Sequence, residues 1–189
     1  MLLPVSILVT VGYLLGCLPI ANSIARRHGI ADLRMVGDQN PGYWNARSTL
    51  GVRAARPILV GDTLKGVVAA LVGLAVSALA DGPWWWVPLA GGAAMLGHAA
   101  PATDGFRGGR SVLTFVGSSL VFAPVAASVA LALAGTIRST TGRTDQASRV
   151  GVAVFPVVQL AIDGPERTLA TGVLMTFVGM RFLTARVAG

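Results

Sequence analysis

Apolar stretches long enough to cross a lipid bilayer recur along this chain of 189 residues, and they constrain its fold more than any other feature. A membrane-spanning helix needs about 20 apolar residues, because the hydrocarbon core is about 30 Å thick. Only 12% of the residues are charged, against roughly 25% in a typical soluble domain. No alternating strand pattern competes with the helical one. We therefore expect an all-α integral membrane protein, with residues 1–189 forming a single polytopic membrane domain.

Seven transmembrane or partly spanning helices are expected, separated by prolines, glycine-containing turns and polar residues. A proline inside a helix removes a backbone hydrogen bond, so Pro124 should divide one long apolar run into two short segments. A turn is expected at residues 163–166, whereas residues 138–149 are expected to be irregular. The expected segments cover residues 2–25, 57–80, 84–102, 112–123, 124–137, 150–162 and 168–185.

Arginines determine the expected orientation, because basic residues concentrate on the cytoplasmic loops of membrane proteins. Seven segments with an outside N-terminus place thirteen of the fourteen arginines, and the C-terminus, in the cytoplasm. Six segments would leave Arg138, Arg143 and Arg149 outside. The net charge of +7 is thus explained by loops that face anionic lipid. No nucleic acid partner is expected.

A polar segment at residues 37–51 follows the first apolar run. It is rich in glycine and holds two of the chain's three asparagines. Irregular backbone near a bilayer is tolerated where it is buried in protein or lines a wet cavity. We therefore interpret this segment as a loop that forms the wall of a site. Within the first apolar run, Asn22 should face protein and not lipid.

Two ionisable residues, Asp62 and Lys65, lie within the second apolar segment. A charged residue at mid-membrane costs roughly 2.5–3.5 kcal/mol and usually has a function. These two are three positions apart, on one helix face. They form either a structural ion pair or part of a substrate site, and we expect Lys65 to be a buried partner of Asp62 or Asp38. His98 is either a general base or a packed, hydrogen-bonded residue.

A second glycine-rich loop ends in Gly108-Gly109-Arg110-Ser111 and opens a helix. Free N–H groups at a helix start can bind an anion, and the planar guanidinium of Arg110 suits phosphate. The alternative is a plain turn. The residues that we expect to line one cytoplasmic pocket are Gly108, Gly109, Arg110 and one of Arg47 or Lys65, with Asp38 at its rim.

The order of these motifs resembles the PlsY family of bacterial membrane glycerol-3-phosphate acyltransferases. The matching residues are Gly37, Asn40, Pro41, Gly42, Asn45, Leu50 and Gly51, then Asp62, Lys65 and Gly66, then Gly97, His98 and Pro101, and finally Phe106, Gly108 and Gly109. The resemblance implies seven helices with cytoplasmic motif loops in the bacterial inner membrane. It also implies acyl transfer from acyl phosphate to glycerol 3-phosphate, which makes lysophosphatidic acid.

The same resemblance suggests roles for individual residues. The catalytic residues would be Asn40, Asn45, Lys65 and His98. The substrate-binding residues would be Gly37, Asp38, Gly42, Arg47, Asp62, Gly108, Gly109, Arg110 and Ser111. The expected partners are the two phosphate-bearing substrates and membrane lipid, and no cofactor is expected. No metal site is expected either, since the chain holds one cysteine, two histidines and one glutamate.

The chain departs from the family motifs at several positions, among them Asp38 for serine, Ser48 for arginine and Arg110 for lysine. The negative charge of Asp38 would repel a phosphate unless Arg47 or Lys65 pairs with it. A second hypothesis is therefore a catalytically silent relative that binds lipid or supports a partner membrane enzyme. A third is a small transporter that uses Asp62 and Lys65 as an intramembrane relay, against which the lack of an inverted repeat argues.

Overall fold

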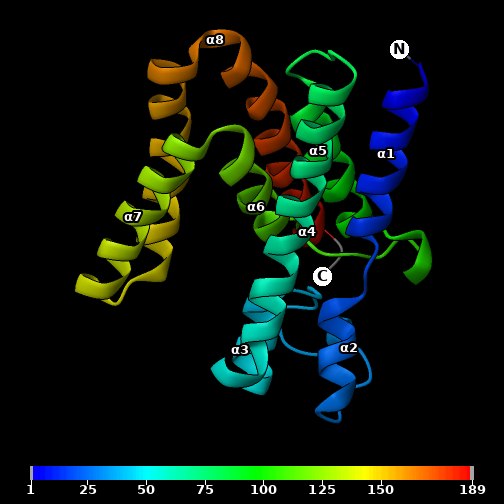
Figure 1. The fold of residues 1–189 in the computed structure, drawn as a ribbon. Coiled ribbons are helices and arrows are strands. Elements are labelled where there is room, and N and C mark those ends of the chain that lie inside the picture. The colour runs from blue at the N-terminus through cyan, green and yellow to red at the C-terminus, as the bar shows by residue number, and fades with distance from the viewer. Residues whose placement is uncertain (1, 188–189) are drawn as a thin grey trace.

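The computed structural model describes residues 2–187, and every regular element in that range is helical (Figure 1). The expected all-α architecture is confirmed. The α-helices are α1 (Leu2–Gly16), α2 (Ile20–Arg27), α3 (Tyr43–Leu50), α4 (Val52–Leu79), α5 (Trp86–Ala99), α6 (Val112–Phe122), α7 (Pro124–Thr141) and α8 (Thr144–Val187), and two 3₁₀ turns are η1 (Leu33–Met35) and η2 (Ala102–Asp104).

The first expected segment, residues 2–25, is wrong as one continuous helix. α1 ends at Gly16 and α2 begins at Ile20, because the ring of Pro19 cannot supply the N–H that a continuous helix needs. α2 then packs on α3 and α4 through Ala25 and its neighbours. Asn22 is 3% exposed, which confirms that it faces protein.

Helices α1, α4, α5 and α6 form the centre of the bundle, and glycines let their backbones approach closely. A Cβ at Gly12 of α1 would lie only 2.6 Å from the carbonyl oxygen of Ala90 in α5, and a Cβ at Gly66 of α4 would overlap that of Thr114 in α6. α4 also packs directly on α5. The ionisable residues of both helices are therefore held on one rigid frame.

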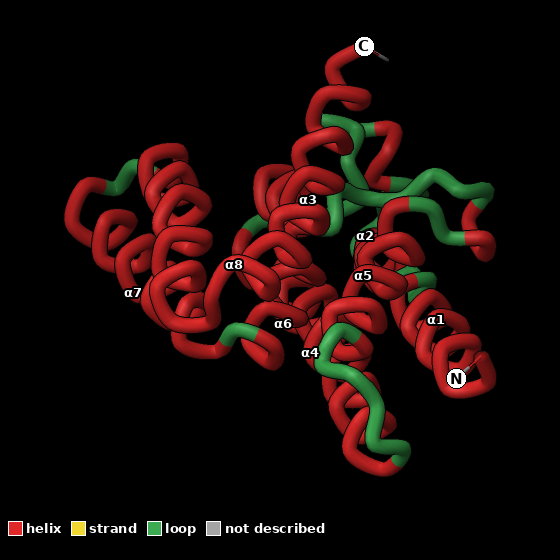
Figure 2. The backbone as a smooth tube through the Cα atoms, turned by 90° about the horizontal axis from the view of Figure 1, so that it is seen from above, coloured by secondary structure: helices red, strands yellow, loops and turns green. Residues whose placement is uncertain are grey.

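Two expected interruptions are confirmed. Ala123 has a non-helical backbone (φ −141°, ψ 60°) and separates α6 from α7 at Pro124. Gly164 has φ 80° and ψ 178°, which divides α8 into two arms. α7 and the first arm of α8 form a hairpin that stands to one side of the bundle (Figure 2). The seven expected segments therefore correspond to α1, α4, α5, α6, α7 and the two arms of α8.

Two polar segments expected to be irregular are largely helical. Residues 43–50 form α3, which ends at Gly51 in a left-handed-type backbone (φ 89°). In the second segment, only Gly142 and Arg143 interrupt the helices. The hydroxyls of Thr140 and Thr141 donate to backbone carbonyls of the preceding turn at 2.8 and 2.7 Å. These polar side chains are satisfied inside the helix, so they do not end it.

The segments differ in length. Three stretches are long and apolar enough to cross a bilayer alone, Leu2–Arg27, Val52–Leu79 and Thr144–Thr184. α6 has only 11 residues, about 16 Å at 1.5 Å per residue, and is therefore partly spanning. The α4–α5 turn and the kink of α8 lie at one end of the molecule, opposite α2, α3 and the α7–α8 turn (Figure 1).

Candidate functional site

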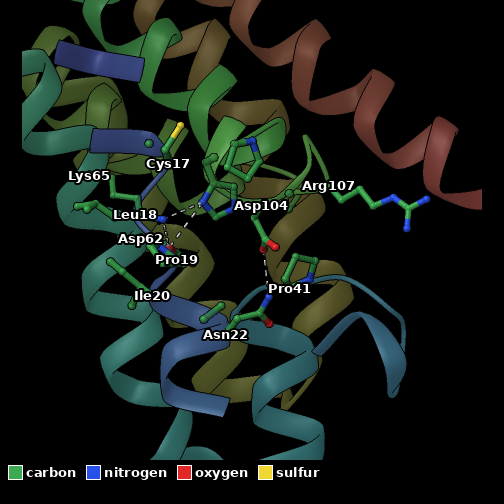
Figure 3. Close-up of a pocket in the computed structure, with 16 residues that line it drawn as sticks. Cys17, Leu18, Pro19, Ile20, Asn22, Pro41, Asp62, Lys65, Asp104 and Arg107 are labelled. Atoms are coloured by element: carbon green, nitrogen blue, oxygen red, sulfur yellow. Dashed lines mark hydrogen bonds and ion pairs between the residues drawn. The ribbon is translucent and has the colours of Figure 1, made fainter. Parts of the chain in front are cut away.

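Three ionisable side chains meet inside the bundle, where α4 faces α5 (Figure 3). Lys65 Nζ lies 3.0 Å from Asp62 Oδ1 and 3.4 Å from His98 Nδ1, and His98 Nδ1 lies 3.6 Å from Asp62 Oδ1. Asp62 is 1% and Lys65 5% exposed. The expected burial of Lys65 beside Asp62 is confirmed. Opposite charges compensate each other here, away from solvent.

The glycine loop before α6 packs on the last turn of α5. Gly108 N donates to Ala99 O and Gly109 N donates to His98 O, each at 3.0 Å. The expectation that these two N–H groups are free for phosphate is therefore wrong. Glycine is needed for space, since a Cβ at Gly109 would overlap His98 Nε2 and one at Gly108 would overlap His98 O. The loop thus packs closely against the imidazole, on its Nε2 side.

Asn45, expected to be catalytic, supports the loop that precedes α3. Its side chain is 1% exposed, and its Oδ1 accepts a hydrogen bond from Asp38 N at 3.3 Å. Its Nδ2 donates to three backbone carbonyls, those of Leu33, Val36 and Asn40. Gly37, with φ 60°, packs directly on the Asn45 amide. Gly37 and Asn45 therefore fix the backbone conformation of this loop.

Asp38 pairs with Arg110 across two loops, with Oδ2 and Nη1 3.0 Å apart. The expected cationic partners were Arg47 and Lys65, and that expectation is wrong. The Arg47 guanidinium carbon instead lies 5.7 Å from the ring centroid of Trp44, which turns it toward its own helix. Lys65 stays with Asp62.

A second ion-pair network joins the same two loops. Arg34 Nη2 lies 2.6 Å from Asp32 Oδ2 and 2.8 Å from Asp104 Oδ1. The hydrogen bonds from Arg34 lower the pKa of the Asp32 carboxyl, and the bonds to Asp32 raise the pKa of Arg34. Asn22 adds a contact from Nδ2 to Asp104 Oδ2 at 3.3 Å. The two motif loops are therefore tied together at several points.

Two adjoining cavities lie between these loops and the bundle. The larger, which we call the basin, has a volume of about 1170 Å³, and its lining includes Asp38, Asn40 and Arg110. The smaller, of about 30 Å³, reaches Asp62, Lys65, His98 and Gly109. The two share Pro41, Asp104, Arg107 and Gly108. The buried charges therefore lie next to the basin. Figure 3 shows the smaller cavity, with Asp62 and Lys65 on one side and Asp104 and Arg107 on the other.

Gly42 and Ser111 lie outside both cavities, although substrate contacts were expected for them. Gly42 is buried at the start of α3. Ser111 is 1% exposed, and its Oγ donates to Met95 O at 2.7 Å. Both residues fix the backbone that borders the basin.

An apolar groove of about 440 Å³ runs between α6, the α7 hairpin and the last arm of α8. Trp44, Val112 and Phe182 lie at the end near the motif loops. Phe155 and Met175 lie at the deep end, where they pack on Ala127. The Arg110 guanidinium carbon is 4.8 Å from the ring centroid of Phe182. The groove therefore begins where the basin ends.

The family profile described as glycerol-3-phosphate acyltransferase matches residues 6–186. The chain belongs to the glycerol-3-phosphate acyltransferase family. It is 36% identical to the glycerol-3-phosphate acyltransferase of Geobacter sulfurreducens over 89% of this chain and 84% of that one. It is 35% identical to the glycerol-3-phosphate acyltransferase of Rubrobacter xylanophilus, over 84% of this chain and 77% of that one.

Two solved structures share the fold. One is PlsY (YgiH), an integral membrane glycerol 3-phosphate acyltransferase, in its glycerol 3-phosphate form. Its TM-score is 0.80 at 28% identity, over 94% of this chain and 87% of that one. The lysophosphatidic acid form has a TM-score of 0.77 at 26% identity, with the same coverage. This chain is therefore a PlsY-like integral membrane protein, as its motifs indicate.

One residue of this glycerol-3-phosphate acyltransferase family member was missed by the sequence reasoning. Arg181, from the last arm of α8, lines the basin and donates to three carbonyls, those of Ala99, Gly108 and Gly109. It thereby ties the glycine loop to α8 and to the end of α5. An arginine within an apolar helix is the signal that the sequence offers, but the sequence does not place it beside the glycine loop.

Proposed function

We propose that this chain transfers a fatty acyl group from an acyl phosphate to glycerol 3-phosphate. The observation that carries the proposal is the junction at Arg110, which lines the basin and lies over Phe182 at the start of the apolar groove. An acyl phosphate has the same two parts, a charged phosphate and an apolar chain. The names of the matched relatives, and the glycerol 3-phosphate and lysophosphatidic acid forms of PlsY, support these substrates.

The basin offers cations for phosphate groups. Arg107 and Arg181 both line it, and neither has a carboxylate oxygen within 4.0 Å among the described residues. A guanidinium can donate two parallel hydrogen bonds to phosphate oxygens, although in Arg181 only Nη1 remains for this, because Nε and Nη2 donate to carbonyls. Arg110 becomes a third such cation when the Asp38 pair opens. The two phosphate-bearing substrates therefore have separate cations available to them.

The buried cluster supplies the chemistry next to the basin. The hydroxyl oxygen of glycerol 3-phosphate forms a bond to the acyl carbonyl carbon, while the bond from that carbon to the phosphate oxygen breaks. Phosphate departs with the electron pair of that bond. His98 accepts the hydroxyl proton at Nε2, the nitrogen beside Gly109, and passes it to the departing phosphate. The Lys65 ammonium stabilises the negative charge that develops.

The test is turnover by the purified protein with palmitoyl phosphate and glycerol 3-phosphate. One molecule of lysophosphatidic acid should form for each phosphate released. His98→Ala should lower turnover by about 100-fold or more, the usual contribution of a positioned acid–base group. His28→Ala is the matched control, since His28 is exposed just after the end of α2. Equal rates for both variants would remove His98 from the reaction.

The Asp38–Arg110 pair favours a second candidate, a catalytically silent relative that binds lipid or supports a partner membrane protein. In that case Asp38 holds a cation that the substrate needs. The protein would then bind phosphate-bearing lipid but release no phosphate from palmitoyl phosphate. Turnover in the assay above eliminates this candidate.

The positive-inside argument also supports a placement in the membrane. The basin would face the cytoplasm of a bacterial inner membrane, with the N-terminus outside and the C-terminus inside. Glycerol 3-phosphate is a charged, water-soluble molecule, so a basin on the cytoplasmic side would receive it without transport.

A further inference from the structure

A separate cavity of about 340 Å³ lies at the end of the bundle opposite the basin. It is enclosed by the α4–α5 turn on one side and by the kinked region of α8 on the other. Trp84 lines it, and Trp84, Trp85 and Trp86 form an aromatic cluster of the kind found at the membrane–water interface. We call it the outer cavity. Nothing in the acyl-transfer reaction uses it.

The outer cavity has one cation, Arg167. It is the single arginine that the seven-segment topology places on that side of the membrane. Its guanidinium carbon lies 5.6 Å from the ring centroid of Trp84. Within the described part of the chain, no carboxylate oxygen comes within 4.0 Å of it. Its charge is therefore available to an anion.

Buried polar groups lie behind this cation. Gln159 and Thr171 line the cavity at 1% and 2% exposure, and Thr171 Oγ1 donates to Gln159 Oε1 at 2.5 Å. Gln159 Nε2 carries two hydrogens, but its one contact among the described residues is with Arg167 O at 3.5 Å. Polar side chains at membrane depth are costly and usually functional. The amide thus offers an N–H to a ligand.

We propose that the outer cavity binds the phosphate group of a membrane phospholipid. The Arg167 guanidinium and the Gln159 amide donate to the phosphate oxygens. The remaining walls are largely apolar, and they include Leu74, Val121 and Phe122, which suit the upper part of the acyl chains. A soluble phosphate ester offers the same oxygens, but it has nothing to place against these walls.

The experiment measures binding of three probes to the full-length protein in detergent: dioctanoyl phosphatidylglycerol, dioctanoylglycerol and inorganic phosphate. We expect the phospholipid to bind more tightly than either other probe. Arg167→Gln should weaken its binding roughly tenfold, the value of a charge-assisted hydrogen bond. Gln159→Leu should also weaken it, without any change in charge. Unfolding temperatures confirm that each variant is folded.

Two control variants locate the probe. Arg143→Gln changes an arginine that is 61% exposed at the other end of the molecule, and it should leave binding unchanged. Arg110→Gln tests the basin as the binding site. The proposal is wrong if Arg110→Gln weakens phospholipid binding while Arg167→Gln does not. It is also wrong if Arg143→Gln weakens that binding as much as Arg167→Gln does. Equal binding of dioctanoylglycerol would show that phosphate is not recognised, and equal binding of inorganic phosphate would exclude lipid as the ligand.

Discussion

Asp38 and Arg110, which are 72 residues apart in the chain, form an ion pair that crosses the rim of the basin. The pair joins the loop before α3 to the loop before α6. Its side chains are 44% and 22% exposed, so substrate can reach both. Arg110 cannot serve a phosphate and Asp38 fully at the same time.

Removal of the Asp38 charge should therefore strengthen substrate binding. We expect Asp38→Ser to lower the Kd of glycerol 3-phosphate by up to about fivefold, since an exposed ion pair is worth roughly 0.2–1 kcal/mol. Isothermal titration of the purified protein measures this. Asp145→Ser is the control, because Asp145 is exposed near Arg143 on the α7–α8 turn. Unchanged or weaker binding in Asp38→Ser would remove Asp38 from the site.

Lys65→Met should destabilise the fold by roughly 3–5 kcal/mol, because it leaves the buried Asp62 carboxylate without its cation. Thermal unfolding in detergent measures the loss. The double variant Asp62→Leu with Lys65→Met should recover most of the stability, yet remain inactive. Full activity in that double variant would show that the ion pair is only structural.

Stability should depend on Asp32 in a defined pH range. Arg34 lowers the pKa of Asp32 below its ordinary value of 3.8, so the folded state holds the proton less tightly than the unfolded chain. The stabilisation is complete above that ordinary value and is lost as pH falls through the lower folded-state pKa. Asp32→Asn should thus reduce the unfolding temperature at pH 6, and this reduction should shrink progressively as the pH falls below 3.8. Glu166→Gln, at the other end, serves as control, and a pH-independent effect of Asp32→Asn would contradict the argument.

The apolar groove should hold the acyl chain. Ala134 lines it, whereas Ala132 is exposed on another face of α7. Ala134→Phe should lower kcat/KM for palmitoyl phosphate roughly tenfold, in the range that a filled apolar pocket produces. Butyryl phosphate should be affected less. If Ala132→Phe has the same effect as Ala134→Phe, the chain does not use this groove.

Labelling should reveal opposite sides of the membrane for the α7–α8 turn and the α8 kink. Thr140→Cys should react from the cytoplasm and Glu166→Cys from outside. Glu166 is preferable to Gly164, whose φ of 80° disfavours any side chain. Cys17 is buried and should give no background in the unsubstituted chain. Reaction of both cysteines from the same side would refute the seven-segment topology.

Much of the fold could be predicted from apolar length and helix breakers. Pro124 and Gly164 change the backbone locally, so their effects are visible in the sequence itself. The helices at residues 43–50 and 138–141 were missed because polar composition was equated with irregular backbone. The hydroxyl and amide side chains of these helices form hydrogen bonds within the helix or to the neighbouring loop. Composition alone does not reveal these hydrogen bonds.

The site was predicted less completely, for a related reason. The cluster of Asp62 and Lys65 follows from helical spacing alone. The hydrogen bonding of the glycine loop does not follow from spacing. Its N–H groups donate to carbonyls at the end of α5, and that contact depends on how the loop packs. Arg47 also looked like a phosphate ligand, but the ring of Trp44 three residues earlier offers it a nearer partner.

The contact of Arg181 with the glycine loop also bears on how the protein is made. Arg181 follows Gly109 by 72 residues, which a ribosome adds in about 4 to 14 seconds at roughly 5–20 residues per second. During that interval the helices α1 to α6 can already be in the membrane, while the loop beside His98 lacks its last three hydrogen bonds. The site is thus completed late in biosynthesis, and a nascent chain stalled before the last arm of α8 should be inserted but inactive.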